Sequence, residues 1–137
     1  MPKLIFKNDS GQVQLHEDGI VHHEFFRRMV GKEFRDILEA GLTQLQNKQA
    51  TKWLSDDRKN TVMEESDEKW AQGDWFPRAA KSGWKYWAIV NPEKAVGKMQ
   101  MSRNAKVMEM GGIKVATFST PDEALSWLRS VDLKKAG

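Results

Sequence analysis

The pattern of apolar and polar residues divides the chain into short alternating runs and longer amphipathic segments. Two β-type runs, 3–7 and 12–17, are separated by Asn-Asp-Ser-Gly, a turn-forming combination, and together they predict a hairpin. Imperfect alternation predicts a third strand within 19–29. From residue 30 onward the apolar residues recur at helical spacing, which predicts an amphipathic helix over 31–48.

In the rest of the chain, predicted strands alternate with predicted helices. Strands are expected at 50–54, 85–90 and 113–118, and the second of these is apolar on both faces, as an internal strand must be. Strands that alternate with helices form right-handed parallel crossovers. The order therefore predicts an α/β fold with a single mixed sheet, in which an N-terminal antiparallel hairpin adjoins mostly parallel strands with flanking helices. A chain of 137 residues is expected to form one domain, over 1–137.

Local signals refine the helices. Gly41 inside the first helix costs about 1 kcal/mol relative to alanine, so it indicates close packing against a neighbour. Ser66 is expected to cap a helix that kinks or breaks at Pro77, and Thr120 with Glu123 forms a capping box for the last helix. For the helix over 92–110, the stripe expected to recur on one face is Ala95, Val96, Met99 and Arg103.

Three segments resemble the SpoIIAA-like, STAS-type domains, also described as STAS/SEC14-like: KWLSDDRK (52–59), WFPRAAKSGWKYWAIVNPE (75–93) and ATFSTPDEALSWL (116–128). The resemblance implies a four-to-five-stranded mixed sheet flanked by helices, used as a regulatory or ligand-binding module and not as an enzyme. One departure concerns the phosphorylatable serine that the switch proteins of this family carry in an Asp-Ser-x-Gly setting. The loop 55–66 lacks that motif, so the phosphorylation switch is not transferred to Ser55 or Ser66.

Composition and charge exclude several classes of function. The chain has no cysteine, which removes disulfides, thiolate metal sites and thiol nucleophiles and fits a reducing cytoplasm. No apolar run approaches the roughly 20 residues that span a bilayer, so no integral membrane association is expected. Although the net charge is +3, the basic residues are dispersed along predicted helices without an interleaved aromatic run, so no nucleic-acid binding is expected.

Two groups of residues could still carry chemistry. His16, His22, His23 and Glu24 offer nitrogen and oxygen ligands for a metal, but adjacent residues of a strand point to opposite faces, so His22 and His23 cannot share one ion. We therefore expect no metal and no cofactor. The acidic loop 55–66 could support a small enzyme or a phosphate-ligand binder as an alternative, but the chain has no G-x-G-x-x-G, P-loop or G-x-S-x-G motif.

The favoured hypothesis is a cytoplasmic, non-catalytic domain that binds an unknown protein partner or a small apolar ligand. A homodimer is a possible oligomeric state under this hypothesis. The carboxyl ends of parallel strands meet at one edge of a sheet, so polar residues after consecutive strands should form one rim. We expect that rim to be exposed and to contact the partner. Its predicted residues are Asp56, Asp57, Arg58, Asn60, Asn91 and Ser119.

Overall fold

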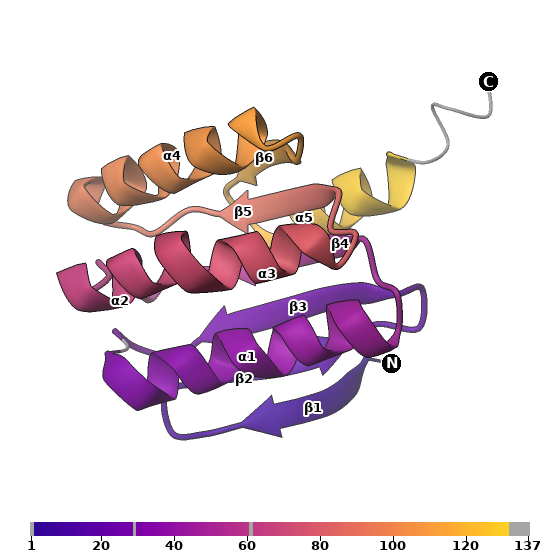
Figure 1. Cartoon of the computed structure of the whole chain (residues 1–137), viewed down its shortest axis with the longest axis horizontal. Helices are drawn as coiled ribbons and strands as arrows, with labels where there is room; N and C mark the ends of the chain where they lie inside the picture. Colours follow the sequence, from indigo (N-terminus) through magenta and orange to yellow (C-terminus); the bar gives the residue numbers. More distant parts are fainter. Residues whose placement is uncertain (1, 29, 61, 132–137) are drawn as a thin grey trace.

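A computed structural model describes residues 2–28, 30–60 and 62–131, which include six strands in a single sheet. The strands follow one another across the sheet in chain order (Figure 1). β1 and β2 pair antiparallel, as do β2 and β3, whereas β3 to β6 are all parallel. The predicted mixed sheet with an N-terminal hairpin is therefore confirmed. The strands are β1 (Lys3–Lys7), β2 (Gly11–Leu15), β3 (Ile20–Phe25), β4 (Lys52–Asp56), β5 (Tyr86–Val90) and β6 (Lys114–Phe118).

The helices lie on both faces of the sheet, with more of them on one face than on the other. Each right-handed crossover from β3 to β6 moves to the next strand in the same direction, which places every connecting helix on one face (Figure 1). The last helix follows β6 and packs on the other face against β4, β5 and β6. None of the described helices is long and apolar enough to span a membrane. The helical elements are α1 (Gly31–Asn47), α2 (Glu65–Trp70), η1 (Ala71–Trp75), α3 (Phe76–Lys81), α4 (Ala95–Met110) and α5 (Pro121–Ser130).

The structure confirms two local predictions, the internal strand and the cap of the last helix. The predicted internal strand over 85–90 is β5, which pairs with β4 on one side and β6 on the other. Every residue of β5 is buried, because helices cover both faces of the sheet at this strand. The capping box is also present: the backbone N–H of Glu123 donates to Thr120 Oγ1 at 3.3 Å.

Of the kink or break expected at Pro77, the break is wrong, because the helical segment continues through the proline; the kink stays a prediction. α2, η1 and α3 form one helical segment, and the turn before Pro77 is widened into a π-helix in which Phe76 N–H donates to the carbonyl of Ala71. A proline cannot donate to the carbonyl four residues earlier, and its ring crowds that turn; the wider turn accommodates both. The predicted cap is wrong as well. The helix begins at Glu65, so Ser66 lies inside its first turn.

The stripe predicted on α4, Ala95, Val96, Met99 and Arg103, faces solvent, and Val96 and Met99 are 64% and 66% exposed. The prediction named the stripe but not the face of the helix that is buried. Two polar side chains lie on that buried face. The buried residues of α4 are Gly97, Gln100, Asn104, Ala105 and Met108.

Most of the core lies between the sheet and α1, α3 and α4. Trp53 on β4 is its central residue, and the ring packs directly against the backbone of Gly41 in α1. A Cβ built on Gly41 would lie 2.7 and 2.8 Å from Trp53 Cζ3 and Cζ2, and closer still to Cη2. The close packing predicted for Gly41 is confirmed. Contact between α1 and β4 depends on this glycine.

We predict that Gly41→Ala destabilises the protein even though alanine favours a helix by about 1 kcal/mol. The new methyl group would displace a fully buried ring, and overpacking of this kind typically costs about 1–3 kcal/mol or more. Denaturant melts should therefore show a net loss of at least roughly 1 kcal/mol. Gly73→Ala is the control, because no atom lies within 4 Å of the added Cβ, and it should leave the free energy of unfolding unchanged or raise it. Equal effects from both substitutions would disprove the packing account.

Candidate functional site

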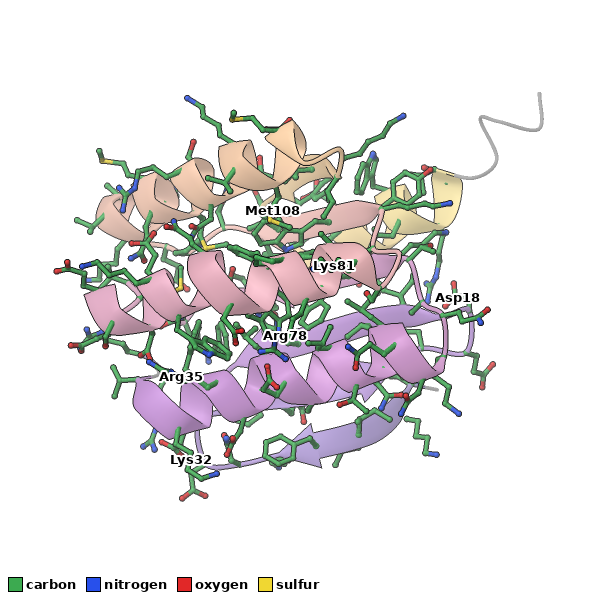
Figure 2. The ribbon with its side chains drawn as sticks, in the orientation of Figure 1. Asp18, Lys32, Arg35, Arg78, Lys81 and Met108 are labelled. Carbon is green, nitrogen blue, oxygen red and sulfur yellow. The ribbon has the colours of Figure 1, made fainter. Side chains whose placement is uncertain are left out.

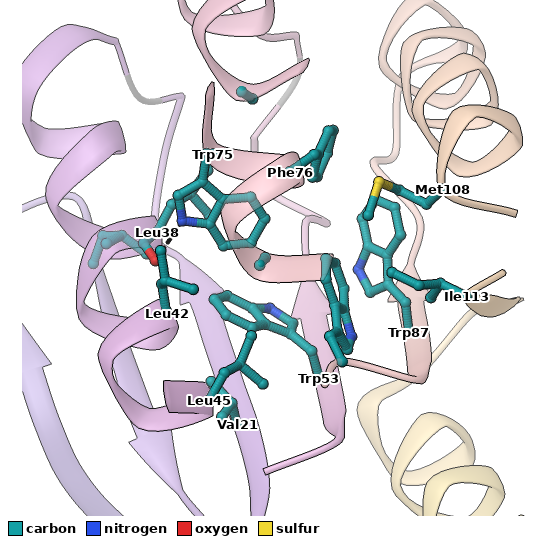
Figure 3. Packing of buried hydrophobic residues seen from close by; sticks show 14 of the residues in the cluster. Val21, Leu38, Leu42, Leu45, Trp53, Trp75, Phe76, Trp87, Met108 and Ile113 are labelled. Carbon is teal, nitrogen blue, oxygen red and sulfur yellow. Dashed lines mark hydrogen bonds between the residues drawn. The ribbon is translucent and has the colours of Figure 1, made fainter. Parts of the chain in front are cut away.

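Four tryptophans form a continuous aromatic layer between the sheet and its helices, and we call them the indole layer: Trp53, Trp75, Trp84 and Trp87. Neighbouring ring centroids are 5.2 to 5.8 Å apart, and most pairs are tilted or edge-on, the arrangements that aromatic quadrupoles favour. Figure 3 shows Trp75 and Trp53 beside α1 and Trp87 beside Met108 of α4. The layer therefore links α1, α3 and α4 to the two central strands.

Every indole N–H of the layer has a hydrogen-bond acceptor. Trp75 donates to the carbonyl of Leu38 and Trp84 to that of Tyr86, both at 2.9 Å. Trp87 Nε1 donates to Ser55 Oγ at 2.7 Å. These bonds fix the orientation of the rings, so the layer is ordered by polar contacts as well as by packing.

The remaining indole begins a buried chain of three side chains. Trp53 Nε1 donates to His23 Nδ1 at 2.9 Å, and His23 Nε2 lies 2.9 Å from Asp57 Oδ1. An indole nitrogen can only donate, so His23 Nδ1 must be the acceptor and the ring proton must reside on Nε2, where it is donated to Asp57. The imidazole is therefore uncharged in this arrangement, and both of its nitrogens are occupied.

A cavity of about 40 Å³ lies beside the indole layer and the Trp53–His23–Asp57 chain, and we call it the tryptophan cavity. One water molecule needs roughly 10–15 Å³ of such space and a benzene ring about 150 Å³, so the cavity admits a group of only a few heavy atoms. Met63 and Met101 line it and are partly exposed, so this part of the wall borders solvent. Their side chains are flexible and can shift for a larger ligand.

The wall formed by α4 is polar. Gln100 accepts from the backbone N–H of Met63 at 2.6 Å and donates to its carbonyl at 3.1 Å, which ties α4 to the loop before α2. Asn104 is fully buried, and its Oδ1 accepts from Gln72 of η1 at 2.7 Å. Its Nδ2 is buried with no hydrogen-bond partner among the described residues. The cavity is therefore lined by an amide donor whose hydrogen-bonding capacity the described residues leave unused.

Ion pairs hold the helices around the cavity. Arg78 of α3 bridges Glu39 of α1 at 2.6 Å and Asp74 at 2.8 Å, and these carboxylates raise the pKa of its guanidinium. Arg35 of α1 contacts Asp67 of α2 at 3.1 Å. Figure 2 shows Arg35 and Arg78 between α1 and the α2–α3 segment. The helical wall of the cavity is thus fixed from the outside by charged contacts.

The predicted rim is only partly where the sequence placed it. Asp56, Asp57 and Asn60 are buried rather than exposed. β4 continues two residues beyond the predicted end at 54, which buries Asp56, and Asp57 follows the strand with its side chain bonded to His23. Asp57 and Asn60 line the tryptophan cavity. Asp56 lies on the opposite face of the sheet, where Arg58 Nη2 contacts it at 2.8 Å.

The other two predicted residues lie at the next strand ends and do not line the cavity. The backbone N–H of Asn91 donates to the carbonyl of Phe118, and its side chain is half-buried. Ser119 is exposed. The expectation of one continuous exposed polar rim is therefore wrong, whereas the assignment of these residues to binding stays a prediction.

The residues that sequence reasoning missed are His23, Gln100 and Asn104. His23 was considered only as a metal ligand, and the two α4 residues were assigned no role. Polar residues at 100 and 104, one turn apart, were the available signal for a polar helix face.

The three histidines divide between the two faces of the sheet, as the alternation of β3 predicts. His22 points away from His23 and approaches His16, with Nδ1 and Nε2 3.0 Å apart. Burial, followed by the nearby imidazole of His16, lowers the pKa of His22 to about 4. No group of three or more candidate metal ligands occurs in the described part of the chain.

Comparison of the chain with family models, with curated proteins and with solved structures found no match. The functional assignment therefore depends on the site.

We predict that His22 makes stability depend on pH between about 6.5 and 4. In this range an unfolded chain protonates the imidazole while the folded protein keeps it neutral, so the unfolded state binds more protons and stability falls as the pH is lowered. A shift of this size is worth roughly 3 kcal/mol at most. Thermal melts of the wild type and His22→Gln at pH 7 and pH 4.5 measure it. Parallel pH profiles for the two proteins would refute the assignment.

We also predict that Asp57→Ala costs about 1–3 kcal/mol of stability, because it leaves the buried His23 Nε2–H without an acceptor. Urea unfolding provides the measurement. Glu109→Ala, which removes an exposed carboxylate on α4, should change the free energy of unfolding by less than about 0.5 kcal/mol. If Asp57→Ala is as mild as Glu109→Ala, the buried hydrogen-bonded chain does not contribute as described.

Proposed function

We propose that this protein is a non-catalytic, STAS-like binding module that holds a small, mainly apolar ligand in the tryptophan cavity. The observation that carries the proposal is the unpaired Nδ2 of Asn104 in the cavity wall. A buried donor without an acceptor costs about 1–3 kcal/mol, a cost that a ligand acceptor would remove. Buried polar groups that converge on an apolar cavity are the usual arrangement of a small-molecule site.

The composition of the walls supports an apolar ligand. Tryptophan, phenylalanine and methionine supply nine of the nineteen described lining residues, and six of the nineteen are polar. The π-helical turn η1 contributes Ala71 and Trp75 to the same wall, and π-turns are frequent at functional sites. The resemblance of the sequence to STAS-type domains, which implies a ligand-binding or regulatory module, points in the same direction.

A binding role accounts for the buried histidine better than acid–base catalysis does. A general base needs a free nitrogen within reach of the substrate, but Trp53 and Asp57 already occupy both ring nitrogens of His23. The phosphate-binding or enzymatic alternative based on the loop 55–66 gains no support from these contacts, since Asp56 is paired with Arg58 and Asp57 with His23.

Native mass spectrometry of the protein purified from its own host tests the proposal. We expect the wild type to carry a stoichiometric small-molecule adduct that Asn104→Leu reduces or abolishes. The same substitution removes the Nδ2 that has no partner among the described residues, but it also removes the acceptor of Gln72, so stability in the absence of ligand should change by less than about 1 kcal/mol. Gln44→Leu is the matched control: it also removes a buried unpaired side-chain atom, but it lies on α1 away from the cavity, so it should keep the adduct. An adduct unaffected by Asn104→Leu, or no adduct on any variant, counts against the site.

A further inference from the structure

We infer that the ligand of the tryptophan cavity is uncharged and presents a hydrogen-bond acceptor, such as a carbonyl oxygen, to Asn104. This inference rests on the proposed function and specifies the chemistry of the same site. Three features of the wall carry it: the absence of cationic side chains among the described lining residues, the carboxylate of Asp57, and the donors that remain available.

The charges around the cavity disfavour an anion. None of the described residues that line it is lysine or arginine, and Asp57 is the acidic one. His23 does not compensate, because Trp53 holds its Nδ1 as an acceptor. Glu68 does not line the cavity; its Oε1 accepts from Gln100 at 3.3 Å and from Arg103 Nη2 at 3.5 Å. A phosphate or carboxylate placed here would be desolvated without a counter-charge, which costs several kcal/mol.

Two side chains of the cavity wall keep an unused hydrogen-bond donor. Asn104 is fully buried, and its Oδ1 is already bonded to Gln72, so only the Nδ2 hydrogens are available to a ligand. Ser55 also lines the cavity; its Oγ accepts from Trp87, which leaves its own hydroxyl hydrogen to be donated. Two donors facing an apolar space require an acceptor, and a donor-only ammonium group cannot pair with them.

The size of the cavity sets the scale of the group that enters. About 40 Å³ accommodates a carbonyl with its nearest carbon atoms, and anything larger must extend past Met63 and Met101 toward solvent. The ligand is therefore either a very small neutral molecule or a larger one that inserts a carbonyl-bearing end. Both kinds of ligand present the same neutral acceptor group to the cavity wall.

Titrations of ¹⁵N-labelled full-length protein with four probes test the inference: xenon, acetone, acetate and methylammonium. The readouts are the indole N–H signals of Trp53 and Trp87 and the side-chain amide of Asn104. Xenon reports whether the cavity admits an apolar guest, whatever the polar chemistry. Acetone, acetate and methylammonium are of similar size and differ in charge and in their hydrogen-bonding groups.

We expect acetone to bind at least tenfold more tightly than acetate or methylammonium. Asn104→Leu should weaken acetone about two- to tenfold relative to any change in xenon binding, the effect of one net hydrogen bond. Gln44→Leu should change neither. If xenon binds but acetone shows no preference over the charged probes, or no dependence on Asn104, the inference is overturned while the cavity remains a binding site. If none of the four probes shifts the signals, the proposed function itself is overturned.

Discussion

The hydrogen bond from Trp53 to His23 is the contact on which the rest of the site depends. It orients the indole against Gly41 on one side and against Trp75 and Trp84 on the other, and it fixes the proton of the imidazole on Nε2. That proton is then donated to Asp57 at the carboxyl end of β4. One buried polar chain thus sets the position of the central aromatic ring and of the cavity wall beside it.

The face of α4 that lies across the cavity from the Trp53–His23–Asp57 hydrogen bonds lowers the stability of the fold. A core-facing helix normally presents apolar side chains, but α4 turns Gln100 and Asn104 inward and leaves Val96 and Met99 exposed. The hydrogen bonds of Gln100 to the backbone of Met63 offset the desolvation of its amide, whereas the Nδ2 of Asn104 has no hydrogen-bond partner among the described residues. Natural proteins keep such locally unfavourable residues mainly where function requires them, which is why we propose a binding site at this amide.

Sequence patterns predicted the framework but not the site, for identifiable reasons. The alternation of strands and helices, the buried strand 85–90 and the Thr120 capping box are local signals, and each is present. The burial of Asp56 was missed because the apolar pattern stops at Leu54 while the strand continues to Asp56. The burial of Asp57 was missed because its partner, His23, is distant in the chain. The packing of Trp53 against Trp75 and Trp84, which lie more than twenty residues later in the chain, is a tertiary event with no local signal. The inward face of α4 was missed because it breaks the hydrophobic pattern on which the prediction relied.

The most direct test of the central contact is the tautomer of His23, measured by long-range ¹H–¹⁵N correlation on labelled protein. The account predicts a neutral ring with its proton on Nε2 and an unprotonated Nδ1 that is coupled to the indole N–H of Trp53. A ring that carries its proton on Nδ1, or on both nitrogens, cannot accept the indole hydrogen bond and would contradict the account.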